Sequence, residues 1–416
     1  MPGSDRSAPS STPLIRRVSL LSTYRENIGD DLIRAGVMHQ IEHFLERKPS
    51  FGHITKSNRL SRYLPLGHLS HFPVQRMPEQ RRRRTQFAGR LLSRLPGARW
   101  IDKTRNCDLF VIAGTPVFYF VGDQDFISNE RIYSEDWPAE IFDKSLDRPD
   151  APALIGLGLG SIYEGEPAGL LDRHPAAANF LRRFLHRARL VTVRDAGTMR
   201  LLECACPERC QILHRTYCPS LWAAARFGIE PAEQPARQAL VGFSLESAGW
   251  SPHPNAREGR RRAFEWVVEA LSVSGYSVRL VAHNDLDHVV QQEESTRLSL
   301  PAPLRLDAEG LLHEASRSRL VVTWRVHGSL AALSMGTPVL LFRTDSRSQA
   351  AEELGAEVLD DLELDRGRLN AVIERLDEDV GQQRRARVDH MRNLIAAETE
   401  RLAARVREAL RAGHSA

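Results

Sequence analysis

The chain contains two successive runs in which strand-like and helix-like segments alternate. This alternation is the strongest indication of its fold. In the first run, apolar segments typical of strands lie at 15–22, 107–114, 153–160, 190–194 and 210–213. Apolar residues recur at helical spacing at 23–46, 177–188 and 195–203. In the second run, strand-like segments lie at 239–246, 276–283, 318–324 and 337–342, with one apolar helix face over 263–271. Alternation of this kind predicts a parallel, doubly wound α/β sheet in each run.

The length of the chain and a linker-like stretch predict two domains. A chain of 416 residues exceeds what one hydrophobic core usually organises. Residues 228–238 are polar and contain proline, which is typical of a linker. We therefore expect two Rossmann-like domains that face a cleft, the arrangement called GT-B. The predicted parts are a disordered tail at 1–13, domains at 14–230 and 239–365, and C-terminal helices over 366–416 that pack across both domains.

Hydrophobicity along the chain predicts a cytoplasmic protein. The N-terminal segment lacks the long apolar core of a signal peptide. The most apolar window, 108–122, is too short to cross a membrane and is interrupted by Gly114 and Pro116.

One strongly basic run, 76–105, has ten Arg or Lys residues against two acids. A solvated loop with an amphipathic helix is its simplest interpretation. Its functional interpretation is a peripheral contact with an anionic membrane, at the inner face of the membrane. Aromatic residues are not interleaved with the charge, so nucleic acid is not an expected partner.

The first predicted strand-to-helix turn holds Gly29 and Asp30. Ligands of open parallel sheets sit beyond the carboxyl ends of strands, beside the free amides of helix N-termini. Glycine allows close approach of a ligand to the backbone. Asp30 could accept a hydroxyl proton, although capping the helix is the more common role for an aspartate there.

Further turns in the first run offer weaker signals. The break at 114–116 follows a strand, and the glycines of 156–161 suit either phosphate binding or close packing. Arg194 and Asp195 follow another strand. Asp195 is well placed to cap the next helix, while Arg194 could either hold an anion or form an ion pair with an acid such as Asp195.

Arg325 and His327 lie where the predicted strand 318–324 gives way to a helix starting near Gly328. In extended backbone, residues i and i+2 project to the same side, so both side chains could reach one ligand. A guanidinium, an imidazole and the amides of a helix N-terminus together suit a phosphate or a carboxylate. The alternative is a half-buried histidine bonded to backbone, with Arg325 reaching solvent.

The segments NIGDDLI (27–33), VRDAGT (193–198) and RVHGSLAALSMGTPVLLF (325–342), taken in this order, resemble the polysaccharide pyruvyl transferase family. The resemblance extends over about 24–342. It implies a GT-B-like fold and an enzyme that moves the enolpyruvyl unit of phosphoenolpyruvate onto two hydroxyls of a sugar. The products are a cyclic pyruvate ketal and phosphate. The implied partners are phosphoenolpyruvate and a sugar or glycolipid acceptor, and no cofactor is expected.

Carried over residue by residue, the resemblance assigns roles to the same positions. Arg325 and His327 match a pair that contacts phosphoenolpyruvate, and His327 matches the acid/base. Arg194 matches a second substrate-binding arginine. Gly29 and Asp30 match the N-terminal turn, with Asp30 as a second candidate for proton transfer and Gly328 as a further substrate contact at the helix start.

The chain departs from the family at Cys218-Pro219, where many relatives have Asp-Pro. This departure puts any role of that aspartate in doubt. It also completes a set of four cysteines within 15 residues: Cys204, Cys206, Cys210 and Cys218. Four thiols so close together raise the possibility of a zinc site, but their spacing fits no common zinc pattern. We expect ordinary thiols and no metal.

Two rival functions remain open at this point. One is a glycosyltransferase of the same architecture that uses a nucleotide sugar. The other is a non-catalytic member that binds a glycan or a partner protein. The donor that protects the protein against heat would separate the first from a pyruvyl transferase.

Overall fold

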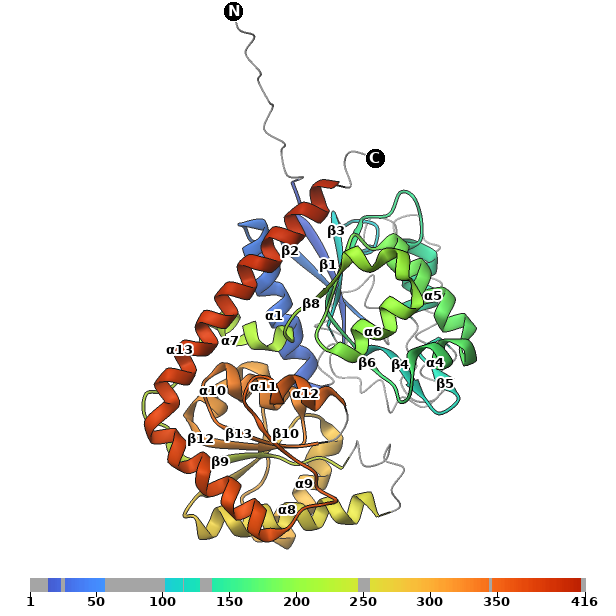
Figure 1. Ribbon diagram of the computed structural model, residues 1–416. Coiled ribbons are helices and arrows are strands. Elements are labelled where there is room, and N and C mark those ends of the chain that lie inside the picture. Colours follow the sequence, from blue (N-terminus) through green and yellow to red (C-terminus); the bar gives the residue numbers. More distant parts are fainter. Residues whose placement is uncertain are drawn as a thin grey trace, which may run out of the picture.

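The computed structural model describes residues 14–23, 27–56, 102–114, 116–127, 137–245, 255–343 and 346–412. The predicted tail at 1–13 and the basic run lie outside the described residues, apart from 102–105. Two sheet-containing domains lie one above the other in Figure 1, and one long helix runs along both.

The N-terminal domain is built on a sheet in the order β2-β1-β3-β6-β4-β5, and β7 and β8 continue from β6. Among the described residues its pairs are parallel except β4 with β5. The strands are β1 (Arg17–Ser22), β2 (Ser50–Thr55), β3 (Leu109–Ala113), β4 (Pro116–Val121), β5 (Gln124–Asp125), β6 (Ala153–Ile162), β7 (Leu190–Val193) and β8 (Leu213–Arg215). The ten-residue β6 pairs with β3 through its first half and with β4 through its last residues, so one strand joins both parts of the sheet.

Helical segments connect these strands. The longest, α1, leads from β1 to β2, and α6 leads from β7 towards β8. The segments are α1 (Ile28–Leu45), η4 (Pro138–Leu146), α4 (Pro167–Arg173), α5 (Pro175–Arg187), α6 (Ala196–Ala205), η5 (Pro207–Ile212), η6 (Pro219–Trp222) and α7 (Ala223–Phe227).

The C-terminal domain has a wholly parallel sheet within the described residues, in the order β11-β10-β9-β12-β13-β14. Its strands are β9 (Ala236–Gly242), β10 (Ser277–Ala282), β11 (Leu304–Arg305), β12 (Ser318–Thr323), β13 (Val339–Phe342) and β14 (Glu357–Leu359). Its helical segments are α8 (Ala256–Val273), α9 (Asp285–Arg297), α10 (Ala308–Arg317), α11 (Val326–Ser334), η8 (Ser346–Ser348) and α12 (Gln349–Glu352).

Both sheets are buried on two faces, as apolar strands without polar alternation predict. In β3, Val111 belongs to one apolar cluster and its neighbour Ile112 to another. In β12, Val321 and Val322 are divided between clusters in the same way. The cluster that contains Val111 also contains Val321, so one continuous apolar layer joins the two domains. The prediction of two parallel α/β sheets is confirmed.

The chain ends in a single helix, α13 (Arg366–Ala412), of 47 residues. It follows the side of both domains in Figure 1. Trp222 Nε1 donates a hydrogen bond of 2.6 Å to Thr399 Oγ1, and Arg384 Nη2 donates one of 2.6 Å to the carbonyl of Ser316. Because Trp222 is in the first domain and Ser316 in the second, α13 holds the two together.

The local predictions were wrong in several places. Residues 207–212 form the 3₁₀ helix η5, so of the strand predicted at 210–213 only Leu213 is in β8. The strands β2 and β4 were not predicted. Strand β9 begins at Ala236, inside the predicted linker.

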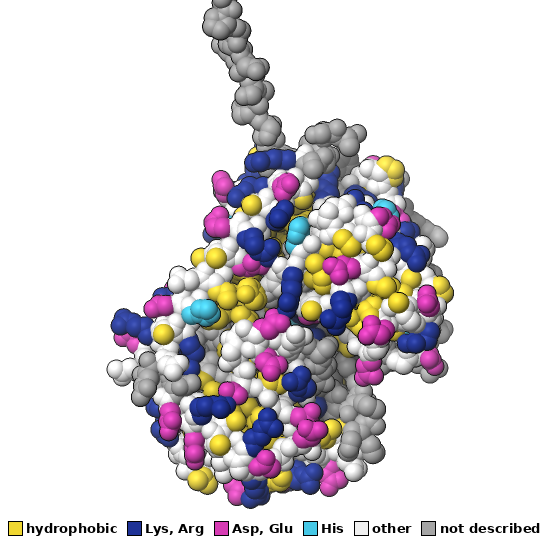
Figure 2. Space-filling model, viewed as in Figure 1, with side chains coloured by type: hydrophobic (Ala, Val, Ile, Leu, Met, Phe, Trp, Pro, Cys, Tyr) yellow, Lys and Arg dark blue, Asp and Glu magenta, His cyan; other side chains and the backbone are white. Residues whose placement is uncertain are grey.

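Charge is mixed over the surface, and basic and acidic side chains are interspersed on the face that Figure 2 shows. Among the described residues, no helix combines the length and the apolar character that crossing a bilayer requires.

Gly36 of α1 should be intolerant of any side chain, because an added Cβ would overlap the backbone carbonyl oxygen of Pro219. We expect Gly36→Ala to lower the free energy of unfolding by about 1–3 kcal/mol, the usual cost of overpacking a core. The control is Gly169→Ala in α4, where nothing lies within 4 Å of the added methyl group. That change should be neutral or stabilise by up to about 1 kcal/mol. Chemical denaturation of both variants measures the difference, and equal effects would contradict the packing described here.

Candidate active site between the two domains

The carboxyl ends of strands from both sheets meet at the seam between the domains. The amide of Ile28, at the start of α1, donates a hydrogen bond of 3.0 Å to the carbonyl of His283, which follows β10. Helices α1, α9 and α11 therefore begin close to one another, each after a strand of a parallel sheet. Such edges are where α/β proteins bind ligands, and helix N-termini favour anions.

Arg194 and His327 are in contact across this seam. Arg194 Nη1 lies 3.1 Å from His327 Nε2 and donates a 2.9 Å hydrogen bond to the carbonyl of Gly114. Both side chains are buried, with exposed fractions of 5% for Arg194 and 8% for His327. Arg194 Nη2 is buried without a hydrogen-bond partner in the described part of the chain. A buried guanidinium with an unsatisfied donor is suited to receive an anion.

The neighbours of His327 fix its protonation state. A guanidinium can only donate, so His327 Nε2 is the acceptor and the single ring proton is on Nδ1. Burial, and then the charges of Arg194 and Arg347, lower the pKa of His327 well below its usual 6.5. The imidazole is therefore neutral at physiological pH in this structure. An anion that bound among these arginines would raise the pKa again, because opposite charge favours the protonated form.

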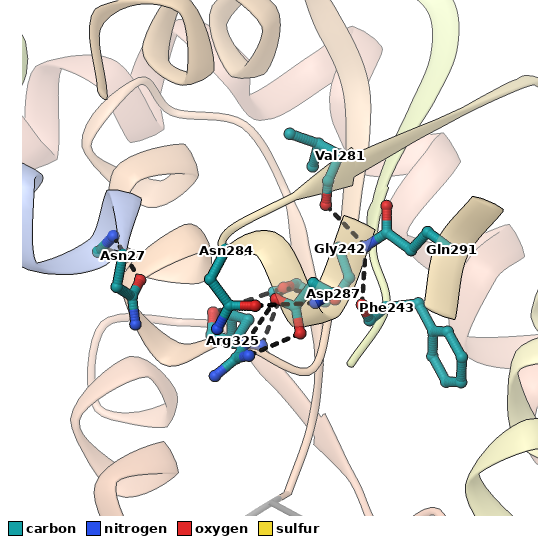
Figure 3. Close-up of polar contacts among 10 residues, drawn as sticks. Asn27, Gly242, Phe243, Val281, Asn284, Asp287, Gln291 and Arg325 are labelled. Atoms are coloured by element: carbon teal, nitrogen blue, oxygen red, sulfur yellow. Dashed lines mark hydrogen bonds and ion pairs between the residues drawn. The ribbon is translucent and has the colours of Figure 1, made fainter. Parts of the chain in front are cut away.

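Arg325 makes a bidentate ion pair with Asp287, the third residue of α9. Arg325 Nε and Nη2 lie 3.0 and 2.6 Å from the two carboxylate oxygens, and the Asp287 side chain is 1% exposed. Figure 3 shows Arg325, Asn284 and Asp287 grouped together, with Asn27 apart from them at the start of α1. The alternative in which Arg325 reaches solvent is therefore wrong.

The geometric argument for Arg325 and His327 was also wrong. Helix α11 begins at Val326, so Arg325 is the extended N-cap residue and His327 is already helical. The two side chains diverge, one towards Asp287 and the other towards Arg194. They border the same seam from different sides.

Two predicted site glycines lie where histidine rings approach the backbone. A Cβ added to Gly29 would overlap the ring of His327 at Nδ1. A Cβ added to Gly328 would lie 2.8 Å from His283 Cε1. Both positions therefore need glycine for close packing at the seam, and their contact with a substrate stays a prediction.

Asp30 does not cap helix α1, although capping was its expected role. Asn27 is the N-cap residue, and its side chain accepts a 2.9 Å hydrogen bond from the amide of Gly29. Asp30 is instead buried in the first turn. Burial raises its pKa from 3.8 to about 6, against the opposing effects of Lys56 and Arg194. A carboxyl group with this pKa can both release and accept a proton near neutral pH.

The raised pKa of Asp30 predicts a pH-dependent cost to stability. A folded-state pKa above the unfolded value means that the folded state favours the protonated form of Asp30. The contribution of this group to the free energy of unfolding is therefore fully present below about pH 4 and is lost as pH rises through about 6. Asp30→Asn should therefore be more stable than the wild type by up to roughly 3 kcal/mol at pH 8, and the difference should shrink towards pH 4. Urea denaturation at several pH values measures this. A difference that does not change with pH would contradict the assigned pKa.

Two residues of the seam, His283 and Asp287, were not predicted from the sequence. His283 is 3% exposed, and its Nδ1 has no hydrogen-bond partner among the described residues. Burial, with Arg325 nearby, lowers its pKa from 6.5 to about 4. It is the last residue of the predicted strand 276–283, as Arg194 is the last residue of 190–194, so the same positional rule could have identified it.

The remaining predicted turns are structural. Asp195 caps α6 by accepting a 2.6 Å hydrogen bond from the amide of Thr198, as predicted. The Arg194 guanidinium contacts Gly114, Cys218 and His327 instead of Asp195. The glycines of 156–161 lie inside β6 and not at a strand end. A Cβ on Gly160 would lie 2.6 Å from Arg194 Nε, so the absence of a side chain at this position leaves room for the guanidinium. Close packing is thus the better interpretation of the segment.

A pocket of about 220 Å³ opens beside Arg194, where β8, α12 and α13 meet. Three arginines and two glutamates line it: Arg194, Arg215, Arg401, Glu353 and Glu398. Both glutamates are occupied, since Glu353 accepts from Arg215 and Glu398 from Arg401 and Thr216. With three arginines against two glutamates, the charged side chains that line the pocket have a net charge of +1.

The four clustered cysteines do not converge on one point. Cys204 is exposed, Cys210 is half-buried, and Cys206 and Cys218 are buried. Cys218 Sγ lies 3.6 Å from Arg194 Nη1 and 3.3 Å from Ser220 Oγ. A buried thiol thus lies beside Arg194.

Comparison with solved structures supports the fold. The S. aureus MnaA structure with UDP matches with a TM-score of 0.52 at 12% identity, covering 95% of this chain and 97% of that one. UDP-GlcNAc 2-epimerase from Methanocaldococcus jannaschii matches with a TM-score of 0.50 at 12% identity, covering 87% and 92%. At this identity the likeness shows the two-domain, GT-B-type fold alone. No curated protein sequence gave a significant match.

Comparison with protein-family models identifies the family, which fold similarity at this identity does not. The model for polysaccharide pyruvyl transferase matches residues 27–346. The match begins at Asn27, the N-cap of α1, and ends beyond β13, so it includes Asp30, Arg194, Arg325 and His327. It covers well over half of the 416 residues. The chain belongs to the polysaccharide pyruvyl transferase family.

Proposed function

We propose that this protein transfers the enolpyruvyl unit of phosphoenolpyruvate onto a sugar of a glycan or lipid-linked precursor, forming a pyruvate ketal and releasing phosphate. The observation that carries the proposal is the positive charge around a buried histidine at the domain seam. Arg194 Nη1 lies 3.1 Å from His327 Nε2. Burial lowers the pKa of His327 most, and the charges of Arg194, Arg347 and Arg325 lower it further. Phosphoenolpyruvate carries a phosphate and a carboxylate, and arginines bind both groups well.

The size of the pocket beside Arg194 also favours this donor. Pockets for drug-sized ligands have volumes of roughly 300–1,000 Å³. The pocket of about 220 Å³ formed by the described residues suits a small anion better than a nucleotide sugar. Of the residues assigned to donor binding, only Arg194 lines this pocket. Arg325 and the backbone at Gly29 and Gly328 are assigned to donor binding from their place at the domain seam.

Two groups with different protonation behaviour can divide the proton transfers. His327 is neutral without a ligand, and the anionic donor would raise its pKa enough for it to hold a proton. We assign to it the protonation of the methylene carbon, which leaves a cationic centre at the neighbouring carbon. Asp30, with a pKa of about 6, would accept the proton of the first attacking hydroxyl.

The second hydroxyl then replaces phosphate. It forms the second carbon–oxygen bond of the ketal, while the bond between that carbon and the phosphate oxygen breaks. Of the two hydroxyl protons, one balances the proton added to the methylene carbon and the other leaves with the phosphate. No redox cofactor is needed for this sequence.

Phosphorus NMR of the purified chain with phosphoenolpyruvate and a panel of sugar and glycolipid acceptors tests the proposal. We expect inorganic phosphate to form only when an acceptor is present. Phosphoenolpyruvate binding without phosphate release across a broad panel would favour a non-catalytic member of the family. Turnover of a nucleotide sugar in place of phosphoenolpyruvate would favour a glycosyltransferase.

A further inference from the structure

Three potential metal ligands converge at the edge of the N-terminal sheet opposite to Arg194. His186 is in the last turn of α5, and Cys206 and Glu208 follow α6. Helices in a parallel α/β unit run against the strands, so α5 and α6 both end at the amino-terminal edge of the sheet. Arg194 follows β7 and lies at the carboxyl edge. The cluster is therefore separate from the candidate active site.

The donor atoms of this cluster are close together. Cys206 Sγ is 3.1 Å from Glu208 Oε1 and 3.8 Å from His186 Nε2, and His186 Nε2 is 3.3 Å from Glu208 Oε1. Cys206 is fully buried, whereas the side chains of His186 and Glu208 are 57% and 61% exposed. The cluster thus has one protected thiol and one side open to solvent.

The spacing of the three atoms fits a tetrahedral ion. Zinc binds cysteine at about 2.3 Å and histidine or carboxylate at about 2.0–2.2 Å, so tetrahedral ligands lie about 3.3–3.6 Å apart. The observed Cys206–His186 and His186–Glu208 separations, 3.8 and 3.3 Å, lie within about 0.3 Å of these values. The Cys206–Glu208 separation, 3.1 Å, is about 0.5 Å shorter than a tetrahedral sulfur–oxygen pair. A thiolate, an imidazole and a carboxylate form a donor set that suits zinc and disfavours magnesium or calcium.

The backbone around the cluster is held in place independently of any ion. Arg209 Nε donates a 3.2 Å hydrogen bond to the carbonyl of Leu185, and its Nη2 donates one of 3.0 Å to the carbonyl of Ala188. These carbonyls flank His186, so one arginine fixes the segment after Cys206 against the end of α5. An exposed imidazole–carboxylate pair by itself contributes little to stability.

We propose that His186, Cys206 and Glu208 bind one Zn²⁺, which ties the end of α5 to the segment after α6 and leaves a fourth position to water. The ion would displace the thiol proton of Cys206. Of the four cysteines in the sequence cluster, only Cys206 takes part. The role is structural, so the site does not depend on the proposed transferase activity.

Cobalt titration of the purified, metal-stripped full chain tests the proposal. Co²⁺ should bind at about one ion per chain and give the visible bands of tetrahedral cobalt with a thiolate-to-cobalt charge-transfer band. Cys206→Ser should abolish the charge-transfer band. Glu208→Gln, a change at an exposed side chain, should weaken binding at least about tenfold. Zn²⁺ should displace the cobalt and raise the melting temperature of the wild type but not of Cys206→Ser.

The control is Cys204→Ser, an exposed thiol two residues away, which should behave as the wild type. Cobalt spectra without a thiolate band, or equal loss of binding in Cys204→Ser and Cys206→Ser, would overturn the proposal. If Cys206→Ser does not fold, Glu208→Gln decides, and unchanged affinity in that variant would overturn the proposal as well.

Discussion

His327→Gln is expected to fold normally, to keep its affinity for phosphoenolpyruvate and to turn over about 10²–10⁴-fold more slowly. A glutamine side chain can still accept the hydrogen bond that Arg194 Nη1 donates at 3.1 Å, so the guanidinium keeps its position. Glutamine cannot carry a proton, so the substitution removes acid/base function alone. Steady-state kinetics with an accepted sugar, together with calorimetric titration of the donor, measure the two effects separately.

His313→Gln is the matched control for this variant, because His313 is an exposed histidine of α10 in the same domain. It should leave both turnover and donor affinity unchanged. Near-normal turnover of correctly folded His327→Gln would remove the catalytic role of His327. A parallel fall in donor affinity would instead assign it to donor binding, with proton transfer left to Asp30.

Arg325→Ala is expected to lower the free energy of unfolding by about 3–5 kcal/mol, because Asp287 would remain as an unpaired charge at 1% exposure. Arg325→Lys should recover only part of the loss, since an ammonium group cannot make both hydrogen bonds that the guanidinium makes. Urea denaturation measures these effects. Arg305→Ala is the control, because its ion pair with Asp285 is exposed and should contribute at most about 1 kcal/mol.

The same arginine is proposed to bind the donor, and a double variant separates the two roles. Arg325→Ala with Asp287→Ala should recover most of the stability, because no unpaired charge remains. Donor affinity should stay about 2–4 kcal/mol below that of the wild type. Wild-type affinity for phosphoenolpyruvate in the double variant would restrict Arg325 to its structural ion pair.

The sequence predicted which residues lie at strand-to-helix boundaries better than how their side chains are arranged. Strand-to-helix boundaries identified Arg194 and His327, because parallel sheets place such residues at one edge. Their contact joins positions 133 residues apart, on different domains, and no local spacing encodes it. The partner of Arg325 was missed for the same reason, since Asp287 is 38 residues away and looks like an ordinary residue of a helix start.

Three local predictions failed, one at a helix start and two at segments that begin with proline. Asn27 and Asp30 are both preferred N-cap residues, and only the start of α1 decides between them. Strand β4 was missed because it begins at Pro116, although the first residue of a strand tolerates a proline. The segment 207–212 forms a 3₁₀ helix because Pro207 suits the first turn of a helix better than a strand.

Calorimetric titration of the wild type and of Arg194→Ala with phosphoenolpyruvate and with UDP-GlcNAc identifies the donor without any knowledge of the acceptor. We expect phosphoenolpyruvate to bind the wild type, and Arg194→Ala to bind it more weakly by about 2–4 kcal/mol while keeping the wild-type circular dichroism spectrum. We expect no binding of UDP-GlcNAc. Tight binding of UDP-GlcNAc without binding of phosphoenolpyruvate, or an unchanged affinity in Arg194→Ala, would contradict the proposed function.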